Sequence, residues 1–379
     1  MLAPPWFPVP PPGYGGIEAV VALLCDELTA RGHQVTLFAA PESRSPANVH
    51  VVLDATHPDA IGSALHESDH VACAWDEIDR AAELGRPFDV VHDHCGFTGL
   101  AMATRMSVPV VHTLHGAFTD DTARFYMRHG HKCRLVAISE TQLALAPRGA
   151  RPVAVVPNPI VVEDWPLVTD KHDYLLWMGR VDPVKGPHHA IAAARRSGRR
   201  LVLAGPVQCG QDAYFRERLE PHIDGENVVF AGEVGGARRK QLFARAKALL
   251  MPIRWAEPFG MVMVEALACG TPVITFPEGA ASEIVIDGEN GYHVDDEREM
   301  AAAIERVDDI DPLRCRSSVQ ARYDVSTVAA RYETVYESAL MAGRRRPLAL
   351  DLRARAARPG RASGTAARRG SEPALQPTG

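Results

Sequence analysis

Residues 174–205, YLLWMGRVDPVKGPHHAIAAARRSGRRLVLAG, contain two apolar runs separated by a basic loop and a helix pattern. The runs 174–179 and 200–205 have the length and composition of buried strands, and 187–196 favours a helix. This order is typical of a parallel βαβ unit. The segment therefore predicts an α/β fold with a ligand site near the loop 179–186, at the carboxyl end of the first strand.

The same alternation extends along the chain in two series, separated by a proline-rich break at 155–166. Further strands are expected at 34–39, 89–94, 109–116, 134–139, 227–232, 248–253 and 271–276. Further helices are expected at 17–31, 97–105, 141–146, 212–221, 238–246 and 260–269. We therefore expect two facing Rossmann-like domains with parallel sheets, 1–165 and 166–325, and a cleft between them. A late helix, 326–342, is expected to pack back on the first domain.

Composition sets the protein class. The 379 residues are 46% apolar and 23% charged, which suits two globular domains. The seven cysteines are scattered and form no CxxC pair, so we expect reduced thiols rather than disulfides or structural zinc. Neither a signal peptide nor an apolar run of about 18 residues is visible. We expect a cytoplasmic protein.

Charge is unevenly distributed. Residues 343–379 hold nine Arg and two acidic residues, a formal charge of +7, which leaves −13 on 1–342. The acidic body argues against a nucleic-acid partner, and the tail composition predicts disorder. The basic stretch 122–134 could meet a phosphorylated or lipid acceptor, so peripheral membrane contact stays open, but we favour a solvated helix for it.

The segment EPFGMVMVEALACGTPVI, 257–274, is the densest candidate for chemistry. It places Glu257 in a loop and Glu265 inside the following helix, whose N-terminus near 259–261 offers free N–H groups to an anion. Carboxylates on either side of a phosphate could accept hydroxyls of a sugar or a ribose. Two Glu on a solvated helix face are the alternative.

Three other features could serve the same ligand. Arg180 and Lys185 could hold a diphosphate, or form only an exposed basic loop. Gly15 and Gly16 precede a helix, where one glycine permits a turn and the other lets the backbone approach an anionic donor. His92, His94, His112 and His115 could begin a metal site, but no further ligands follow a recognisable spacing. For His115 we favour a polar role toward substrate.

Taken together, these motifs resemble family 4 of the retaining glycosyltransferases, which have the GT-B fold. The resemblance covers about 3–340 and rests on PGYGGIE (12–18), HTLHG (112–116), GRVDPVKG, the 257–274 segment and GENGYHV (288–294). It implies transfer of a sugar, expected to be a hexose, from a nucleoside diphosphate sugar without a metal or other cofactor. The acceptor, whether small molecule, glycan or lipid-linked, stays open.

The resemblance also implies residue roles. Arg180 and Lys185 would neutralise the diphosphate, Glu265 would accept the ribose hydroxyls, and Glu257 would contact the donor sugar. The backbone of Phe259, Gly260 and Met261 would bind near the phosphate and sugar. His115 would lie close to the donor sugar, and Gly15 and Gly16 would form the loop that approaches the phosphate.

One departure concerns the start, MLAPPWFP, which leaves about three residues for the first strand. Either the true start lies upstream or the domain tolerates a short strand. Other readings stay open at this point: a nucleoside diphosphate sugar epimerase, a metal-dependent hydrolase built on the histidines, and a non-catalytic binding relative.

Overall fold

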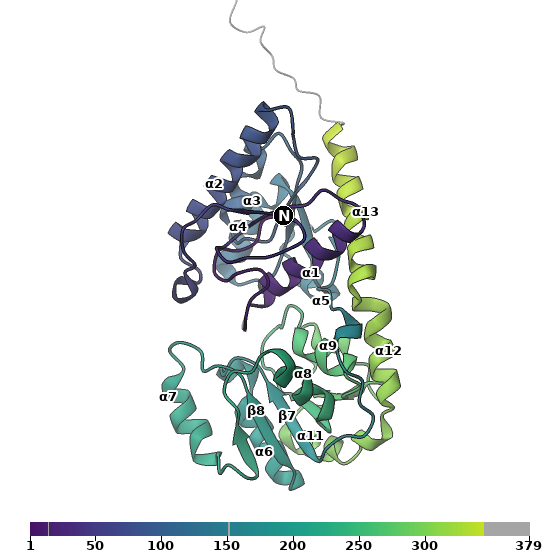
Figure 1. Cartoon of the computed structure of the whole chain (residues 1–379). Coiled ribbons are helices and arrows are strands. Elements are labelled where there is room, and N and C mark those ends of the chain that lie inside the picture. The colour runs from purple at the N-terminus through teal and green to yellow at the C-terminus, as the bar shows by residue number, and fades with distance from the viewer. Residues whose placement is uncertain (14, 151, 345–379) are drawn as a thin grey trace, which may run out of the picture.

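The computed structural model describes residues 1–13, 15–150 and 152–344 and shows two α/β halves stacked end to end (Figure 1). Helix α12 lies beside the C-terminal half, and α13 continues along the N-terminal half. The expected disordered tail lies outside the described residues, except for 343 and 344 at the end of α13.

The helices are α1 (Gly16–Ala30), α2 (Ala64–Glu83), α3 (Thr98–Met102), α4 (Asp120–His129), α5 (Glu140–Leu145), α6 (Pro187–Ser197), α7 (Asp212–Tyr214), α8 (Gly236–Arg245), α9 (Met261–Ala268), α10 (Ala281–Ile284), α11 (Glu297–Ile304), α12 (Pro312–Tyr323) and α13 (Val325–Arg344). The strands are β1 (Thr36–Ala39), β2 (Asn48–Val51), β3 (Val91–Asp93), β4 (Val110–Thr113), β5 (Arg134–Ala137), β6 (Ala154–Val155), β7 (Tyr174–Met178), β8 (Arg200–Ala204), β9 (Val228–Phe230), β10 (Ala248–Met251), β11 (Val273–Thr275) and β12 (Gly291–His293).

The C-terminal sheet has six parallel strands in the order β12-β11-β10-β7-β8-β9. Its two central strands are β10 and β7, and β7 contributes the fully buried Trp177 to the core. Continuous apolar runs are what a sheet covered on both faces requires, so the five strands expected here are confirmed. The sixth, β12, was not expected because three residues beginning with glycine give no strand signal.

The N-terminal sheet is completed by the first residues of the chain. Leu2 forms parallel bridges to both Phe38 and Asp93 and so lies between β1 and β3. Its N–H donates to His92 O over 2.8 Å, and its carbonyl accepts from His94 N over 3.0 Å. The short first strand is therefore accommodated within the sheet, whose strand order becomes β2-β1-(Leu2)-β3-β4-β5-β6. Strands β2 and β6 and helix α2 were not expected from the sequence.

Two crossings of the chain join the halves and lie side by side. The Ile160 N–H donates to Tyr323 O over 2.8 Å, and the Val325 N–H donates to Ile160 O over 2.9 Å. The Asp324 carboxylate accepts from the Ser326 N–H over 3.1 Å, so it caps the beginning of α13.

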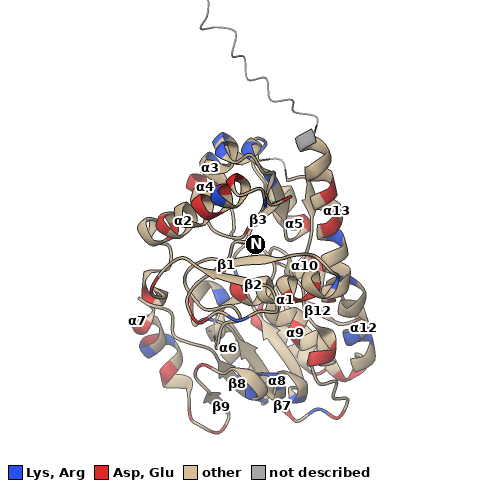
Figure 2. Ribbon diagram, turned by 45° about the horizontal axis from the view of Figure 1, so that its top comes forward, with Lys and Arg blue, Asp and Glu red and all other residues tan. Residues whose placement is uncertain are grey.

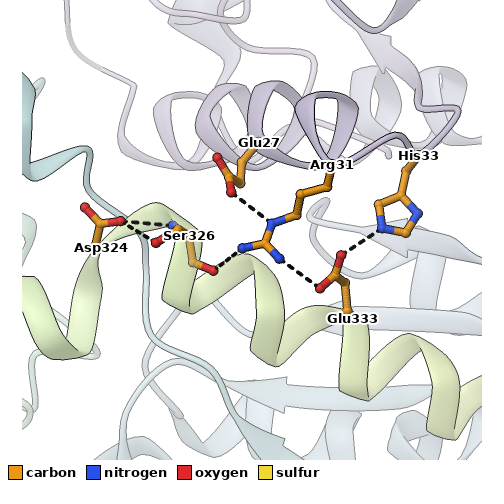
Figure 3. Close-up of polar contacts among 6 residues, drawn as sticks. All are labelled: Glu27, Arg31, His33, Asp324, Ser326 and Glu333. Atoms are coloured by element: carbon orange, nitrogen blue, oxygen red, sulfur yellow. Dashed lines mark hydrogen bonds and ion pairs between the residues drawn. The ribbon is translucent and has the colours of Figure 1, made fainter.

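Helix α13 is fastened to α1 by a cluster of polar side chains (Figure 3). Arg31 bonds Ser326 O over 2.6 Å and Glu333 over 3.2 Å, and His33 bonds Glu333 over 2.9 Å. On the inner side of α13, apolar residues share a core with α1, β4 and β5, with Val328, Tyr332, Val335 and Ala339 packed among Val20, Leu24, Val111 and Val136. The last described helix thus covers the N-terminal sheet.

Gly205 provides a test of the β7–β8 architecture. It has φ +139°, and an added Cβ would lie 1.8 Å from Gly179 O, whereas Gly198 has φ +63° and open space around it. We expect Gly198→Ala to cost about 1 kcal/mol from left-handed strain alone, and Gly205→Ala about 3 kcal/mol or more because backbone must also move. Urea unfolding of both variants measures the difference, and equal losses would contradict this packing.

Candidate active site

Helix α9 begins at the carboxyl edge of the C-terminal sheet. Gly260 is its N-cap with φ +94°, and Met261 is its first residue, so the N–H groups of Met261 and Val262 have no carbonyl of the helix to bond, whereas Met263 N–H donates to Gly260 O over 3.0 Å. The Phe259 ring is buried and contacts Tyr323 edge to face at 5.5 Å. The Phe259 side chain is therefore held in the core next to the end of α12, and a role for the backbone of 259–261 toward a ligand stays a prediction.

Lys185 and Glu257 form an ion pair directly before α9. Lys185 ends a 3-10 turn after β7, and its Nζ bonds Glu257 Oε2. Trp255 Nε1 donates to the same oxygen over 3.0 Å, and Lys185 Nζ lies 4.7 Å from a Trp255 ring centre. The two charged side chains are only 13% and 10% exposed, so the alternative of a merely exposed basic loop is wrong for Lys185.

Arg180 lies in the same loop and is positioned separately from this pair. Its Nη1 donates to Gln208 Oε1 over 2.9 Å, and Gln208 follows the neighbouring strand β8. The loop at the carboxyl end of β7 thus carries both cations that the sequence singled out, and the end of β8 supplies a partner for one of them.

Glu265 lies inside α9 and pairs with Arg239 of α8. Counted over the whole residue, Glu257 and Glu265 are each 8% exposed, so the alternative of two Glu on a solvated helix face is wrong. Arg239 was missed because its run ARRKQ resembles an exposed helix face. Trp255 was missed as well, although it lies only two residues before Glu257.

The two glycines before α1 differ in their surroundings. Gly15 is buried with φ +147°, and a Cβ there would lie 2.7 Å from Pro11 Cβ, so the turn requires glycine at this position. Gly16 is exposed, and a Cβ added to it would have no atom within 4 Å. The preceding loop reaches the other half, since a Cβ on Gly13 would lie 2.8 Å from Glu233 Oε1.

A buried carboxylate, Glu18, lies beneath this loop. It is 3% exposed, and its Oε2 is 3.3 Å from the Cβ position at Gly15. Burial raises the pKa of Glu18 to about 7, although backbone hydrogen bonds at Glu18 and Phe7 oppose the shift.

The four histidines of the N-terminal half lie close together at the ends of β3 and β4, and they are partnered within the protein. His112 Nδ1 bonds Asp93 over 2.7 Å, and His92 bonds Thr113 over 2.8 Å and Tyr336 over 2.7 Å. The remaining two bond each other, as His94 Nδ1 lies 2.9 Å from His115 Nε2. Burial lowers the pKa of His115 to about 3. Within the described ranges, no group of three or more His, Cys, Asp or Glu could hold a metal ion.

A cavity of about 200 Å³ lies between the halves beside Glu257. It is lined by Ala117, Phe118, Thr141, Gln142 and Leu145 from the N-terminal half and by Ala256, Glu257 and Pro258 from the C-terminal half. Gln142 Nε2 donates to Leu114 O over 3.1 Å and to Gly116 O over 2.9 Å, and so holds the turn that carries His115. The expected cleft is therefore present, with Glu257 on one wall and the His115 turn next to the other.

The basic stretch 122–134 falls on α4, the turn that follows it and the first residue of β5. Acidic and basic residues both occur on α4 (Figure 2), and Arg124 pairs with Asp121 over 2.6 Å. Lys132 Nζ bonds Ala101 O over 2.8 Å, so part of this charge serves the N-terminal half itself. None of the helices in the described ranges combines the length and the apolar character that crossing a bilayer requires.

Two parallel α/β halves that face each other across a cleft are the GT-B architecture. Comparison with known proteins agrees: residues 14–164 match the family model for glycosyltransferase family 4, and 164–322 match the family model for glycosyl transferases group 1. The chain belongs to the family 4, group 1 glycosyltransferases, enzymes that use nucleotide-sugar donors.

Several relatives match along most of their length. Glycogen synthase of Mycobacterium tuberculosis is 28% identical, with 89% of this chain and 94% of the relative covered. Phosphatidyl-myo-inositol mannosyltransferase of Mycobacterium leprae is 27% identical, with 90% and 97% covered. Among solved structures, AviGT4, a glycosyltransferase involved in avilamycin A biosynthesis, is 29% identical with a TM-score of 0.67 and coverage of 90% and 97%. HepE of Anabaena, solved with UDP, shares the fold at 20% identity, a TM-score of 0.64 and coverage of 84% and 96%.

Glu18 generates a prediction on pH and stability. Its pKa is raised from 4.5 to about 7, so between these values the unfolded chain has released a proton that the folded chain still holds. The free energy of unfolding from this group therefore falls as pH rises through that window, by about 3 kcal/mol at most. In Glu18→Gln the loss disappears because the amide does not ionise, while its oxygen can still accept a backbone hydrogen bond. We expect the variant to gain stability relative to wild type between pH 5 and pH 8 in urea unfolding, and a constant difference would contradict it.

Proposed function

We propose that this glycosyltransferase moves a hexosyl group from a nucleoside diphosphate sugar to an acceptor hydroxyl, with retention at the anomeric carbon and without a metal. The observation that carries the proposal is the direct contact between Lys185 and Glu257. In such a donor the phosphate is bonded to the sugar ring, so a cation for the phosphate and a carboxylate for the sugar hydroxyls must lie next to each other. The pair meets this requirement at the beginning of α9.

Stabilisation of the leaving group is the main chemical task. When the bond from the anomeric carbon to the phosphate oxygen breaks, negative charge collects on the diphosphate. Arg180, Lys185 and the first N–H groups of α9 are the groups proposed to neutralise it. The acceptor oxygen bonds to the anomeric carbon on the same face, and the departing phosphate takes the acceptor's proton.

The nucleoside end of the donor is proposed to lie along α9 toward Glu265. The Glu265 carboxylate, held by Arg239, would accept hydrogen bonds from the ribose hydroxyls. The UDP in the HepE structure and the hexose named in the mannosyltransferase relative support a nucleotide-linked hexose. The nucleoside of the donor is left open among uridine, guanosine and adenosine.

The acceptor is proposed to enter beside the His115 turn, through the cavity that Glu257 shares with Phe118 and Gln142. His115 would contact the donor sugar from the N-terminal half. A small molecule, a glycan and a lipid-linked acceptor all stay compatible with this arrangement.

A thermal-shift panel with UDP, GDP and ADP sugars tests the donor class. A ligand that binds only the folded state stabilises it by about 2.7 kcal/mol at one hundred times its dissociation constant. We expect sugars of one base to raise the midpoint clearly above the others. If no nucleotide sugar shifts the midpoint at millimolar concentration, the proposal is wrong.

Substitutions at the two ion pairs test the site. We expect Lys185→Ala and Glu265→Ala each to lower turnover by about a hundredfold or more, measured as release of nucleoside diphosphate from the stabilising donor. Lys247→Ala is the matched control, because Lys247 pairs with Asp308 at the surface over 2.8 Å. Near wild-type turnover in either site variant would overturn the assignment.

Stability has to be separated from catalysis in that experiment. Removing Lys185 alone leaves Glu257 as a buried, unpaired charge, which destabilises by about 3 to 5 kcal/mol. The double variant Lys185→Met/Glu257→Gln removes both charges, so we expect it to unfold at higher urea than Lys185→Ala while staying inactive.

A further inference from the structure

The contact between His94 and His115 has no role yet in the proposed sugar transfer. His94 directly follows β3 and is 1% exposed, and its Nδ1 lies 2.9 Å from His115 Nε2. Its other nitrogen, Nε2, is buried and has no hydrogen-bond partner in the described part of the chain. The rings lie 5.2 Å apart at an interplanar angle of 27°.

Both imidazoles are held in place by the strands that carry them. The backbone N–H of His94 donates to Leu2 O over 3.0 Å, and the centre of its ring lies 4.0 Å from that of His92. The turn of His115 is held on both sides by the Gln142 amide. The contact between the two rings is therefore part of the rigid sheet edge, not a chance meeting of mobile side chains.

Only one proton can lie between the two facing nitrogens. Burial lowers the pKa of both side chains, so both imidazoles are neutral at physiological pH and each carries one N–H. If His115 Nε2 donated, the proton of His94 would be on Nε2, where a buried donor would lack an acceptor. If His94 Nδ1 donates, His94 Nε2 carries no proton and is only an unpaired acceptor. Proteins tolerate a buried unpaired acceptor better than a buried unpaired donor.

We propose that His94 is a positioning residue that donates its Nδ1–H to His115 Nε2 and thereby fixes His115 as the Nδ1–H tautomer. His115 then has a single remaining polar group, an N–H donor, which can bond only an acceptor such as a sugar hydroxyl or a phosphate oxygen. The inference rests on the proposed function for the reaction, whereas the tautomer itself can be measured without any substrate.

Two substitutions separate the hydrogen bond from simple packing. His94→Leu removes the donor, while His94→Asn keeps one, because the asparagine amide nitrogen can take the place of imidazole Nδ1. His70→Leu is the matched control: His70 is also a fully buried histidine of the N-terminal half, but its Nε2 bonds Ala3 O over 2.9 Å.

Nitrogen NMR of the full chain labelled in histidine reads the tautomer directly. We expect His115 to be Nδ1–H in wild type, His94→Asn and His70→Leu, and to become a mixture in His94→Leu. A His115 that is Nε2–H in wild type, or that keeps its tautomer in a folded His94→Leu, overturns the proposal. The wild-type spectrum alone decides the direction of the bond if His94→Leu fails to fold.

Kinetics then test the consequence for the reaction. With the donor that gives the largest thermal shift, we expect His94→Leu to lower kcat for nucleoside diphosphate release about tenfold with KM changed less than about twofold, and His94→Asn to restore most of it. Equal kcat losses in His94→Leu and His70→Leu would reduce His94 to a packing role. A wild-type enzyme that cleaves no nucleotide sugar would count against the proposed function, while the NMR result would still decide the positioning of His115.

Discussion

The structure depends on one constraint: the carboxyl ends of two parallel sheets have to be held against each other. In a parallel sheet all strands end at the same edge, so a single contact between the halves brings every strand-end loop toward one cleft. The paired crossings at Ile160 and Asp324 provide the connection, and α13 returns to the N-terminal sheet immediately afterwards. Further contacts bridge the cleft, including the Glu283 carboxylate of α10, which accepts the N–H groups of Glu140 and Thr141.

Within the cleft, two ion pairs orient the charged side chains in the protein without a ligand. Lys185 is neutralised by Glu257, and Arg239 by Glu265, and both carboxylates are largely buried. Such pairs are costly to desolvate and contribute little net stability, so their stability alone does not explain why they occur here. The pairs fix the orientation of each cation, and each carboxylate still has lone pairs that can accept hydrogen bonds from hydroxyl groups. A ligand that offers phosphate and hydroxyls together can use both members of a pair.

Much of the fold could be predicted from the sequence because the strands of the C-terminal half are continuous apolar runs separated by segments with a helical pattern. The exceptions are short or mixed in character: β12 has three residues, and half of the side chains of α2 are polar. The pairings in the site could not be predicted. Lys185 and Glu257 are 72 residues apart, and only the parallel register of β7 and β10 brings their loops together. The histidines illustrate the same limit, since the β3–β4 register decides that His112 meets Asp93 while His94 meets His115.

The charge balance of the cleft also bears on selectivity. Residues 1–342 carry a formal charge of −13, so a polyanion approaching this body meets general repulsion. The local cations Lys185 and Arg239 are each paired with a carboxylate. A free diphosphate would have to compete with Glu257 for Lys185, and it has no hydroxyl that could donate a hydrogen bond to the displaced carboxylate. In the proposed complex, a diphosphate bonded to a sugar and a ribose would provide hydroxyl donors for Glu257 and Glu265 while its phosphates engage Arg180 and Lys185. On the proposed function, the carboxylates would favour the complete donor over free phosphates, because the same buried groups that weaken the attraction for charge would strengthen the recognition of hydroxyls.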